Sequence, residues 1–503
     1  MQTTHPSVSS PIHHGLPSEA YVPATMPHLL GTGDLTSLFL LNVFWVTNVT
    51  PVVAGGTASF TYWLLAGVLF FIPCSVVMAQ LVTLYPYAGS IYNWTQHALG
   101  SGWSFFVSII AWLPGVLSMI NAAAVTVSCL QALNARWVVP TWQQGLVILA
   151  VLVFAGVLSF QRTRTIQHVL NVAAGAMGLA TLLIMISALV WLLTGHHSAT
   201  NFTDVSGWRI VPLGPQTNLA LLGSVTLALL GSDMPLAMAG EVKEKKSLTR
   251  HLTVATGLTL AGYLLFTFAL LVVQGASVAG NTANPISLLI ATVDGVLGKG
   301  LGTVMAVCLM FYFLMIPVAL NVCFARFLVV AAVDQRVTKW FARLNHERVP
   351  TNALLSQIVI ASILTVLIYF LIPAITVLGK PADLTSEVYN VLGAGLLLVW
   401  AVSFMFPFID LAVLYYRDRD TLLQKRIAPL PLLLICVVSG MTLCAATIYF
   451  TLLNSFIPQL IPNSSWWYIT GGLAVITLGI IAVFSVFVTS EASWQVAQDE
   501  SRV

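Results

Sequence analysis

The sequence predicts an all-α integral membrane protein with about twelve membrane-spanning helices. Two observations lead to this fold class: 58% of the 503 residues are hydrophobic while only 7% are charged, and the apolar residues come in runs of about 20 or more, the length that a spanning helix needs. Soluble domains have about 25% charged residues, so these residues cannot supply a polar surface. The runs do not alternate with period two, which favours helices over the strands of a membrane barrel.

The apolar runs give two sets of six expected spans, joined by loops of unequal charge. We predict spans at residues 34–58, 62–85, 102–131, 140–160, 166–194, 218–240, 251–275, 300–332, 352–376, 386–416, 428–453 and 466–490. With a cytoplasmic N-terminus, sixteen of the 20 basic residues lie in cytoplasmic loops, and outside are only Arg136, Arg209, Lys299 and Lys380. This division obeys the positive-inside rule. We therefore expect a multi-pass protein of the cell membrane, surrounded by lipid, with both termini in the cytoplasm.

The two ends of the chain are expected to be cytoplasmic tails. Residues 1–33 are rich in proline, histidine and serine and contain no lysine or arginine, so they lack the basic region of a signal peptide. We predict a disordered tail at 1–33, a transmembrane domain at 34–490 and a second tail at 491–503.

Two expected spans are interrupted by polar residues followed by proline. The first interruption is Thr47-Asn48-Val49-Thr50-Pro51, and the second is Gly231-Ser232-Asp233-Met234-Pro235. Proline removes a backbone donor and disfavours helix at the preceding residue. We expect Thr50 or Asp233 to cap the half-helix that follows, with the proline in its first turn.

Matched interruptions in two halves of a membrane protein are a pointer to a transporter's binding site, although proline kinks in continuous helices are common. Half-helix N-termini attract carboxylates, and loose carbonyls accept ammonium groups, which suits a zwitterionic amino acid. Asp233 can contact a substrate amine, take part in proton movement or cap its half-helix. The predicted substrate-binding residues are Thr47, Asn48, Val49, Thr50, Pro51, Gly231, Ser232, Asp233 and Met234.

Three stretches resemble the amino acid–polyamine–organocation (APC) superfamily of transporters. The first is Ala79-Gln80-Leu81 with Pro86 to Trp94 and Gly100, where Gln80 and Ser90 replace the family's Glu and Gly. The second is Gly231-Ser232-Asp233 with Glu241-Val242-Lys243, which lacks the family's following Asn-Pro. The third is Asn321 to Arg326, then Asp334, then Arg348-Val349-Pro350.

This resemblance implies a five-plus-five inverted repeat of the leucine-transporter kind, with broken helices 1 and 6. Repeat one would cover about 34–194, repeat two about 218–416, and two extra helices about 428–490. It implies a secondary or exchange transporter that moves amino acids or related small amines by alternating access, with substrate between the two breaks. A polyamine or organocation transporter, or an amino acid sensor of the same fold, remains an alternative.

Further polar residues are candidates for gating or for the cavity wall. Glu241 with Lys243, and Arg326 with Asp334, lie at the cytoplasmic ends of spans 6 and 8. They can form a closing gate or belong to ordinary basic loops. Trp112, Asn121 and Tyr312 are candidates to face the cavity, although packing is the commoner role of such residues.

Other functions and the coupling mode are judged by what the sequence lacks. There is no Gly-x-Ser-x-Gly, HExxH or metal-ligand cluster and no filter motif, so an enzyme, a metal site, a cofactor and a channel are not expected. Sodium-coupled members of the fold use span 8 hydroxyls, but residues 304–327 contain no Ser or Thr. Exchange (antiport) or facilitated transport is therefore expected, while His168 and Asp233 keep a proton route open. The oligomeric state stays undetermined.

Overall fold

The regular structure of the chain is helical throughout residues 16–211, 218–281, 284–375 and 380–500, which the computed structural model describes. Eleven of its helical segments are long and apolar enough to cross a membrane. The one remaining predicted span, the sixth along the chain at 218–240, consists of two short helices, α10 (Ala220–Ala228) and η4 (Met234–Glu241). The predicted all-α membrane fold is therefore confirmed, and the span that falls short of the length criterion is one of the two predicted to be broken.

Most spans coincide with the predicted ranges to within a few residues. The continuous ones are α7 (Ser101–Leu133), α8 (Thr141–Ser159), α9 (Thr163–Leu193), α11 (Lys246–Val273), α14 (Lys299–Val333), α19 (Leu430–Leu453) and α20 (Asn463–Glu500). The composite ones are α2 (Thr32–Val43) with η1 (Val46–Asn48) and α3 (Val49–Val53); α4 (Ala58–Ala66) with η2 (Gly67–Phe71) and α5 (Ile72–Leu84); α15 (Thr351–Val366) with η6 (Leu367–Leu371) and η7 (Ile372–Ala374); and α16 (Pro381–Ser403) with α17 (Phe406–Arg417).

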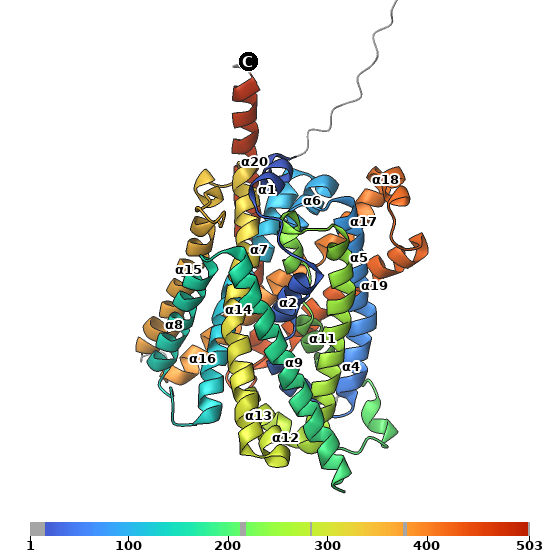
Figure 1. The fold of residues 1–503 in the computed structure, drawn as a ribbon, viewed down its shortest axis with the longest axis vertical. Helices are drawn as coiled ribbons and strands as arrows, with labels where there is room; N and C mark the ends of the chain where they lie inside the picture. Colours follow the sequence, from blue (N-terminus) through green and yellow to red (C-terminus); the bar gives the residue numbers. More distant parts are fainter. Residues whose placement is uncertain (1–15, 212–217, 282–283, 376–379, 501–503) are drawn as a thin grey trace, which may run out of the picture.

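Short helices lie at the two ends of the bundle. At one end are α1 (Pro17–Thr25), α6 (Ile91–Leu99) and α18 (Arg419–Gln424), and at the other are α12 (Ala276–Asn281) and α13 (Pro285–Leu297) (Figure 1). Two 3₁₀ turns complete the fold, η3 (Val205–Trp208) and η5 (Lys339–Ala342). We call the end with α1, α6 and α18 the basic end, because it carries the loops in which most lysines and arginines fall.

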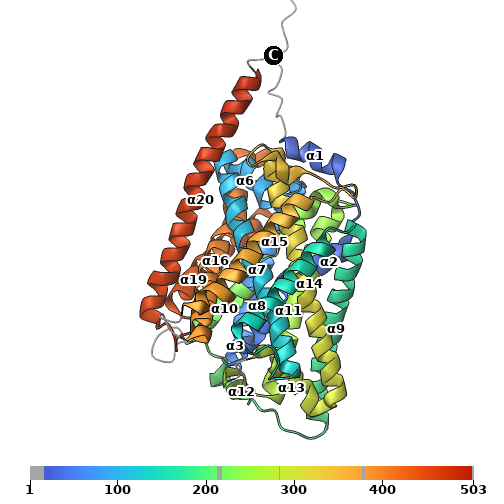
Figure 2. The same cartoon turned by 90° about the vertical axis from the view of Figure 1, so that its left-hand side faces the viewer.

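The helices differ in how much of their surface the protein covers. The most apolar 18-residue window is 72% buried in each of the first three spans, but only 33% in α8, α9 and α19 and 17% in α20. Figure 2 shows α20 running along the side of the bundle. The interior is thus built around α2, α7 and α14, while α8, α9, α19 and α20 present apolar residues such as Leu182, Val438 and Ile480 to the lipid.

The ends of the chain are more structured than predicted. Residues 17–25, inside the expected tail 1–33, form α1, because Val22 and Met26 give this segment an apolar side that packs into the bundle. Residues 1–15 lie outside the described residues. At the other terminus α20 continues through Glu500, across most of the expected tail 491–503; residues 501–503 are outside the described part.

Candidate functional site

The first break interrupts the first span earlier than the sequence predicted. Helix α2 ends at Val43, Phe44 (φ −88°, ψ 80°) and Trp45 (φ −103°, ψ 102°) leave the helical region, and helix resumes at Val46. Thr47 to Thr50 therefore belong to the restarted helix rather than to the break. The reason is that proline is tolerated in the first turns of a helix, where its missing N–H costs nothing, so Pro51 lies after the break. Thr50, inside α3, does not cap it.

The second break falls where the sequence placed it. Helix α10 ends at Ala228, and helix resumes at Met234, with Pro235 in the first turn of η4. Gly231 has φ +104°, a conformation that residues with a Cβ rarely adopt. Asp233 stands at the N-cap position, but its side chain accepts no capping hydrogen bond, and Oδ1 lacks a partner within the described part of the chain. Asp233 thus occupies the predicted N-cap position but makes no capping hydrogen bond.

A single tyrosine hydroxyl joins the two breaks. The Tyr263 hydroxyl, from α11, accepts the Trp45 N–H at 3.1 Å and lies 2.7 Å from the Val43 carbonyl and 3.2 Å from the Ala228 carbonyl, either of which can take its proton. Val43 and Ala228 are the last residues of the two interrupted helices. Unpaired backbone groups inside a membrane cost several kcal/mol, so Tyr263 stabilises both breaks at once.

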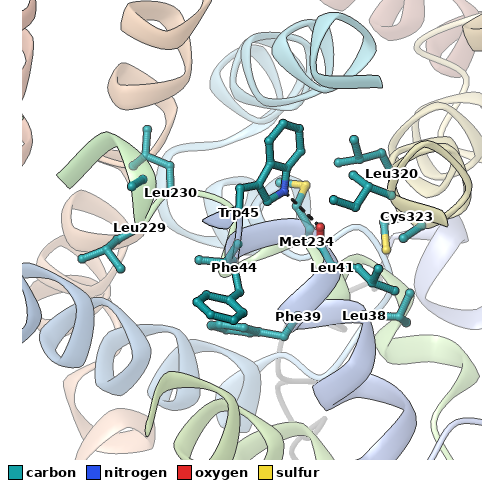
Figure 3. Packing of buried hydrophobic residues seen from close by; sticks show 14 of the residues in the cluster. Leu38, Phe39, Leu41, Phe44, Trp45, Leu229, Leu230, Met234, Leu320 and Cys323 are labelled. Carbon is teal, nitrogen blue, oxygen red and sulfur yellow. Dashed lines mark hydrogen bonds between the residues drawn. The ribbon is translucent and has the colours of Figure 1, made fainter. Parts of the chain in front are cut away.

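The remaining carbonyls at the end of α2 are covered by two more aromatic side chains. The Tyr312 hydroxyl, from α14, lies 2.6 Å from the Leu40 carbonyl and 3.0 Å from that of Phe44. The Trp45 indole N–H turns back to donate to the Leu41 carbonyl at 3.1 Å, the bond dashed in Figure 3. The break is therefore held by hydroxyl and indole groups rather than by charges.

A cavity of about 790 Å³ adjoins both breaks and extends toward α12 and α13. Its wall includes Asn42, Trp45, Thr47, Asn48, Thr50 and Pro51 from the first broken span, Ala228 and Leu230 from the second, Ser118 and Asn121 from α7, and Asn390 and Trp400 from α16. Ala279 and Pro285 contribute from the end opposite the basic end.

The cavity is polar but uncharged. Its lining residues, as far as the chain is described, include no Lys, Arg, Asp or Glu. Four buried polar atoms of the lining find no partner among the described residues: Asn42 Oδ1, Thr50 Oγ1, Trp400 Nε1 and Thr451 Oγ1. The lining itself carries amide, hydroxyl and indole side chains without a charge, which suits a polar, net-neutral ligand.

Four of the nine predicted binding residues line the cavity, and the other five do not. Thr47, Asn48, Thr50 and Pro51 line the cavity, whereas Val49 is buried and not part of the lining. The run Gly231 to Met234 is also absent from the lining and lies behind it. A Cβ on Gly231 would be 3.4 Å from the Asn42 carbonyl oxygen and 3.5 Å from the Trp400 ring.

The remaining members of that run contact neighbouring helices. The Ser232 hydroxyl lies 3.7 Å from Cys74 Sγ and 3.5 Å from Met78 Sδ of α5. Asp233 is fully buried beside it, so a direct charge pair between Asp233 and a ligand in this cavity has no support from the geometry.

Of the three other predicted cavity residues, Asn121 lines the cavity, whereas Trp112 and Tyr312 do not. Asn121 lines the cavity, where it accepts a hydrogen bond from the Tyr389 hydroxyl. Trp112 instead donates to Gln357 at 3.2 Å, and Tyr312 lies behind the first break. The sequence analysis missed Tyr263 and Trp400. Both sit in continuous apolar runs, which give no signal that a polar atom meets a break.

Two of the four predicted gating residues form an ion pair between the ends of spans 6 and 8. Glu241 does not pair with Lys243 but with Arg326, through Nε–Oε1 at 2.7 Å and Nη2–Oε2 at 3.0 Å, with both side chains fully buried. Lys243 is exposed, and Asp334 accepts two hydrogen bonds at 2.9 Å from Ser18 of α1. The cause is that η4 ends against α14, so the bidentate guanidinium reaches the end of η4 itself rather than the loop.

Helix α1 closes the basic end of the bundle over this ion pair. The Glu241 carbonyl accepts the N–H groups of Leu29 and Leu30, at 2.9 Å and 3.0 Å. Glu19 of α1 pairs with His97 of α6 at 2.7 Å. Burial raises the pKa of the Asp334 carboxyl, while the bonds from Ser18 act in the opposite direction. These contacts cover the ion pair at the basic end, while the cavity extends toward the opposite end.

Comparison with known proteins assigns the family. Residues 30–494 match the model of the amino acid permease family, so the chain belongs to that family. It is 27% identical over 228 residues to an uncharacterized transporter of Legionella pneumophila, covering 43% of this chain and 47% of that protein. It is 25% identical over 263 residues to the inner membrane transporter YjeM of Escherichia coli, covering 48% and 52%. The chain therefore spans about half the length of the curated relatives that it matches.

The fold is shared with a solved structure. The crystal structure of MhsT in complex with L-phenylalanine superposes with a TM-score of 0.59 at 14% identity, over 86% of this chain and 100% of that one. Together these findings place the chain in the amino acid permease family and show the leucine-transporter-like fold, with helices 1 and 6 broken. They confirm the predicted superfamily and favour a transporter over an enzyme.

Proposed function

We propose that this member of the amino acid permease family carries a neutral amino acid, as its zwitterion, by alternating access through the cavity between the two breaks. One observation carries the proposal: the described lining of the cavity at the paired breaks has amide, hydroxyl and indole side chains and no charged side chain. A zwitterion is charged at both ends but neutral overall, so half-helix ends and polar side chains can bind it without a buried counter-ion. MhsT, which shares the fold, binds L-phenylalanine.

The two poles of the substrate would occupy opposite sides of the first break. Its carboxylate would face Thr47 and Asn48, at the positive start of the restarted helix, where backbone N–H groups attract anions. Its ammonium group would face Asn42 Oδ1, near the negative end of α2. The side chain would contact apolar wall residues such as Leu320 and Leu397. Gly231 to Met234 would hold the second break in shape behind Trp400.

The alternative of a polyamine or organocation substrate is disfavoured by the same cavity. A buried cation needs an anionic partner, and Asp233 is not among the cavity-lining residues. A sensor of the same fold would bind the amino acid without moving it. A transport assay, rather than a binding assay, distinguishes a transporter from such a sensor.

For coupling, we propose exchange or facilitated transport without sodium. The Tyr312 hydroxyl can donate to the Phe44 carbonyl, and the Leu40 carbonyl accepts the Phe44 N–H at 2.8 Å, so both oxygens are satisfied without a cation. For orientation, we propose that the basic end is cytoplasmic in the cell membrane. In this orientation the proposed substrate cavity would lie toward the outer side of the membrane.

The test is a counterflow experiment with the full-length protein in proteoliposomes. A thermal-shift screen of amino acids and polyamines first identifies a ligand, because binding raises apparent stability. Liposomes loaded with that ligand should then take up labelled ligand from sodium-free buffer, faster than unloaded liposomes. Stabilisation by putrescine or spermidine alone would contradict the proposed substrate. Uptake that requires an inward sodium gradient would contradict the proposed coupling, and binding without any uptake would indicate a sensor.

A further inference from the structure

A second cavity, which the transport function leaves unexplained, opens on the side of the bundle between α5 and α11. It has a volume of about 770 Å³, and we call it the α5–α11 groove. Figure 1 shows α5 and α11 close together along the length of the bundle, with α19 on the other side of α5. At the bottom of the groove the hydroxyls of Ser75 and Thr256 bond each other at 2.6 Å. The walls are formed by apolar residues such as Val76, Val82 and Leu252.

The groove faces the lipid. Gly257 leaves it open, because a Cβ at this position would find no atom within 4 Å. Exposed apolar residues flank it, namely Val68 and Ile72 on the α5 side and Leu258 on the α11 side. An apolar hollow at this place in a membrane protein is filled by an acyl chain, since water there would find few polar partners.

Positive charge gathers where the groove reaches the basic end. Lys245 and Lys246 both line it and are exposed. They stand at the N-terminus of the 28-residue helix α11, whose dipole adds a partial positive charge. Glu244 is the one acidic residue between Lys243 and Arg250, so the local balance stays positive.

The opposite side of the mouth adds further basic residues, held in place by a buried amide. Gln80 of α5 donates to the Lys425 carbonyl at 3.3 Å and accepts the Ile427 N–H at 2.9 Å. Ile427 lines the groove, and Lys425 and Arg426 precede it. A carboxylate at position 80 could accept but not donate. The glutamine that departs from the superfamily pattern therefore fixes a basic loop beside the groove.

We propose that the α5–α11 groove is a binding site for an anionic phospholipid of the leaflet at the basic end. One acyl chain would lie along the apolar walls, and the phosphate would lie between Lys245 and Lys246. A free phosphate ion would use the lysines alone and leave the groove unfilled, so the lipid is the occupant that fits both features. The inference is independent of which substrate the transporter carries.

The test compares phosphatidylglycerol with phosphatidylcholine of the same chains, titrated onto the full-length protein and counted by native mass spectrometry. We expect phosphatidylglycerol to bind more tightly. The double variant Lys245→Gln/Lys246→Gln should weaken that binding by about fivefold per lysine and weaken the binding of phosphatidylcholine, whose choline offsets its phosphate charge, much less. The matched control Lys339→Gln/Arg343→Gln removes two exposed basic residues at the same end, away from the groove, and should bind like the wild type.

A second variant tests the groove itself. Thr253→Trp places a large ring at an exposed lining position and should lower the binding of both lipids, while excess inorganic phosphate should not displace phosphatidylglycerol. Equal binding of the two lipids by the wild type, or the same loss in the lysine variant and its control, would overturn the proposal. So would unchanged lipid binding by Thr253→Trp, or displacement of the lipid by phosphate.

Discussion

Replacing Tyr263 with phenylalanine removes the one hydroxyl that joins the two breaks and leaves the packing of its ring in place. The ring stacks on Trp63 with centroids 4.2 Å apart and meets Phe44 edge-on at 5.0 Å. Phenylalanine keeps both contacts. The variant therefore isolates the hydrogen bonds to Val43, Trp45 and Ala228.

The expected loss follows from the groups that the hydroxyl leaves behind. The buried Trp45 N–H keeps only its bond to the Val43 carbonyl at 3.1 Å, and one carbonyl loses its donor. An orphaned buried group costs about 1–3 kcal/mol, but interhelical hydrogen bonds in membranes average about 0.6 and reach about 1.7 kcal/mol, because the structure finds other partners. We expect a combined cost of about 1–2 kcal/mol. If this cost destabilises the conformation of the breaks that binds the ligand, the affinity for the ligand falls about 5- to 30-fold.

The measurement is the affinity of purified Tyr263→Phe for the amino acid found in the thermal-shift screen, together with its thermal midpoint without ligand. Both should fall. Tyr369→Phe removes a buried hydroxyl from η6, away from both breaks, and should leave the affinity unchanged. If Tyr263→Phe binds and melts like the wild type, the hydroxyl does not hold the breaks and the reasoning from unpaired backbone groups is refuted.

Three further substitutions test the second break, the ion pair and the contact with α1. Gly231→Leu should abolish uptake in a folded protein, because position 231 has φ +104° and a Cβ there would already touch Trp400 at 3.5 Å, so the rest of a leucine side chain would crowd the ring; normal uptake kinetics would rule out this site. Glu241→Gln should destabilise the protein by about 3 kcal/mol or more, since it leaves the Arg326 charge buried without a counter-charge, while Glu241→Leu/Arg326→Met should recover much of that loss. Equal melting of wild type and single variant would count against a buried pair. Because burial raises the pKa of Asp334, its contribution to stability is fully present below the ordinary carboxyl pKa and is lost as pH rises through the raised value. Asp334→Asn should remove that decline in melts from about pH 4 upward, and an unchanged pH profile would contradict the assignment.

The spans could be predicted from the sequence because each must present about 20 apolar residues to lipid. The short helices could not. Helix α1 has nine residues, too few to be stable by itself in water, and it forms because Val22 packs against the bundle while Ser18 bonds Asp334. The sequence shows neither partner.

The site was predicted in part for a similar reason. Glycine and proline mark a break, so Gly231 identified the second one. The first break has no glycine, and Pro51 marks the start of the restarted helix, so the prediction was displaced toward the C-terminus. Side chains that reach the breaks from other spans, such as Tyr263 and Trp400, depend on distances between helices that the sequence does not contain.

The distribution of paired and unpaired groups around the breaks explains how an uncharged cavity can select a zwitterion. Tyr263, Tyr312 and the Trp45 indole satisfy the carbonyls on the protein side of the break, so the broken backbone is stable without a ligand. The atoms left unsatisfied, Asn42 Oδ1 and Trp400 Nε1 among them, belong to residues of the cavity wall. An apolar solute in the cavity would leave these groups without partners, which costs about 1–3 kcal/mol for each. The proposed zwitterion supplies both a donor and an acceptor, so its binding recovers the hydrogen bonds that the empty cavity lacks.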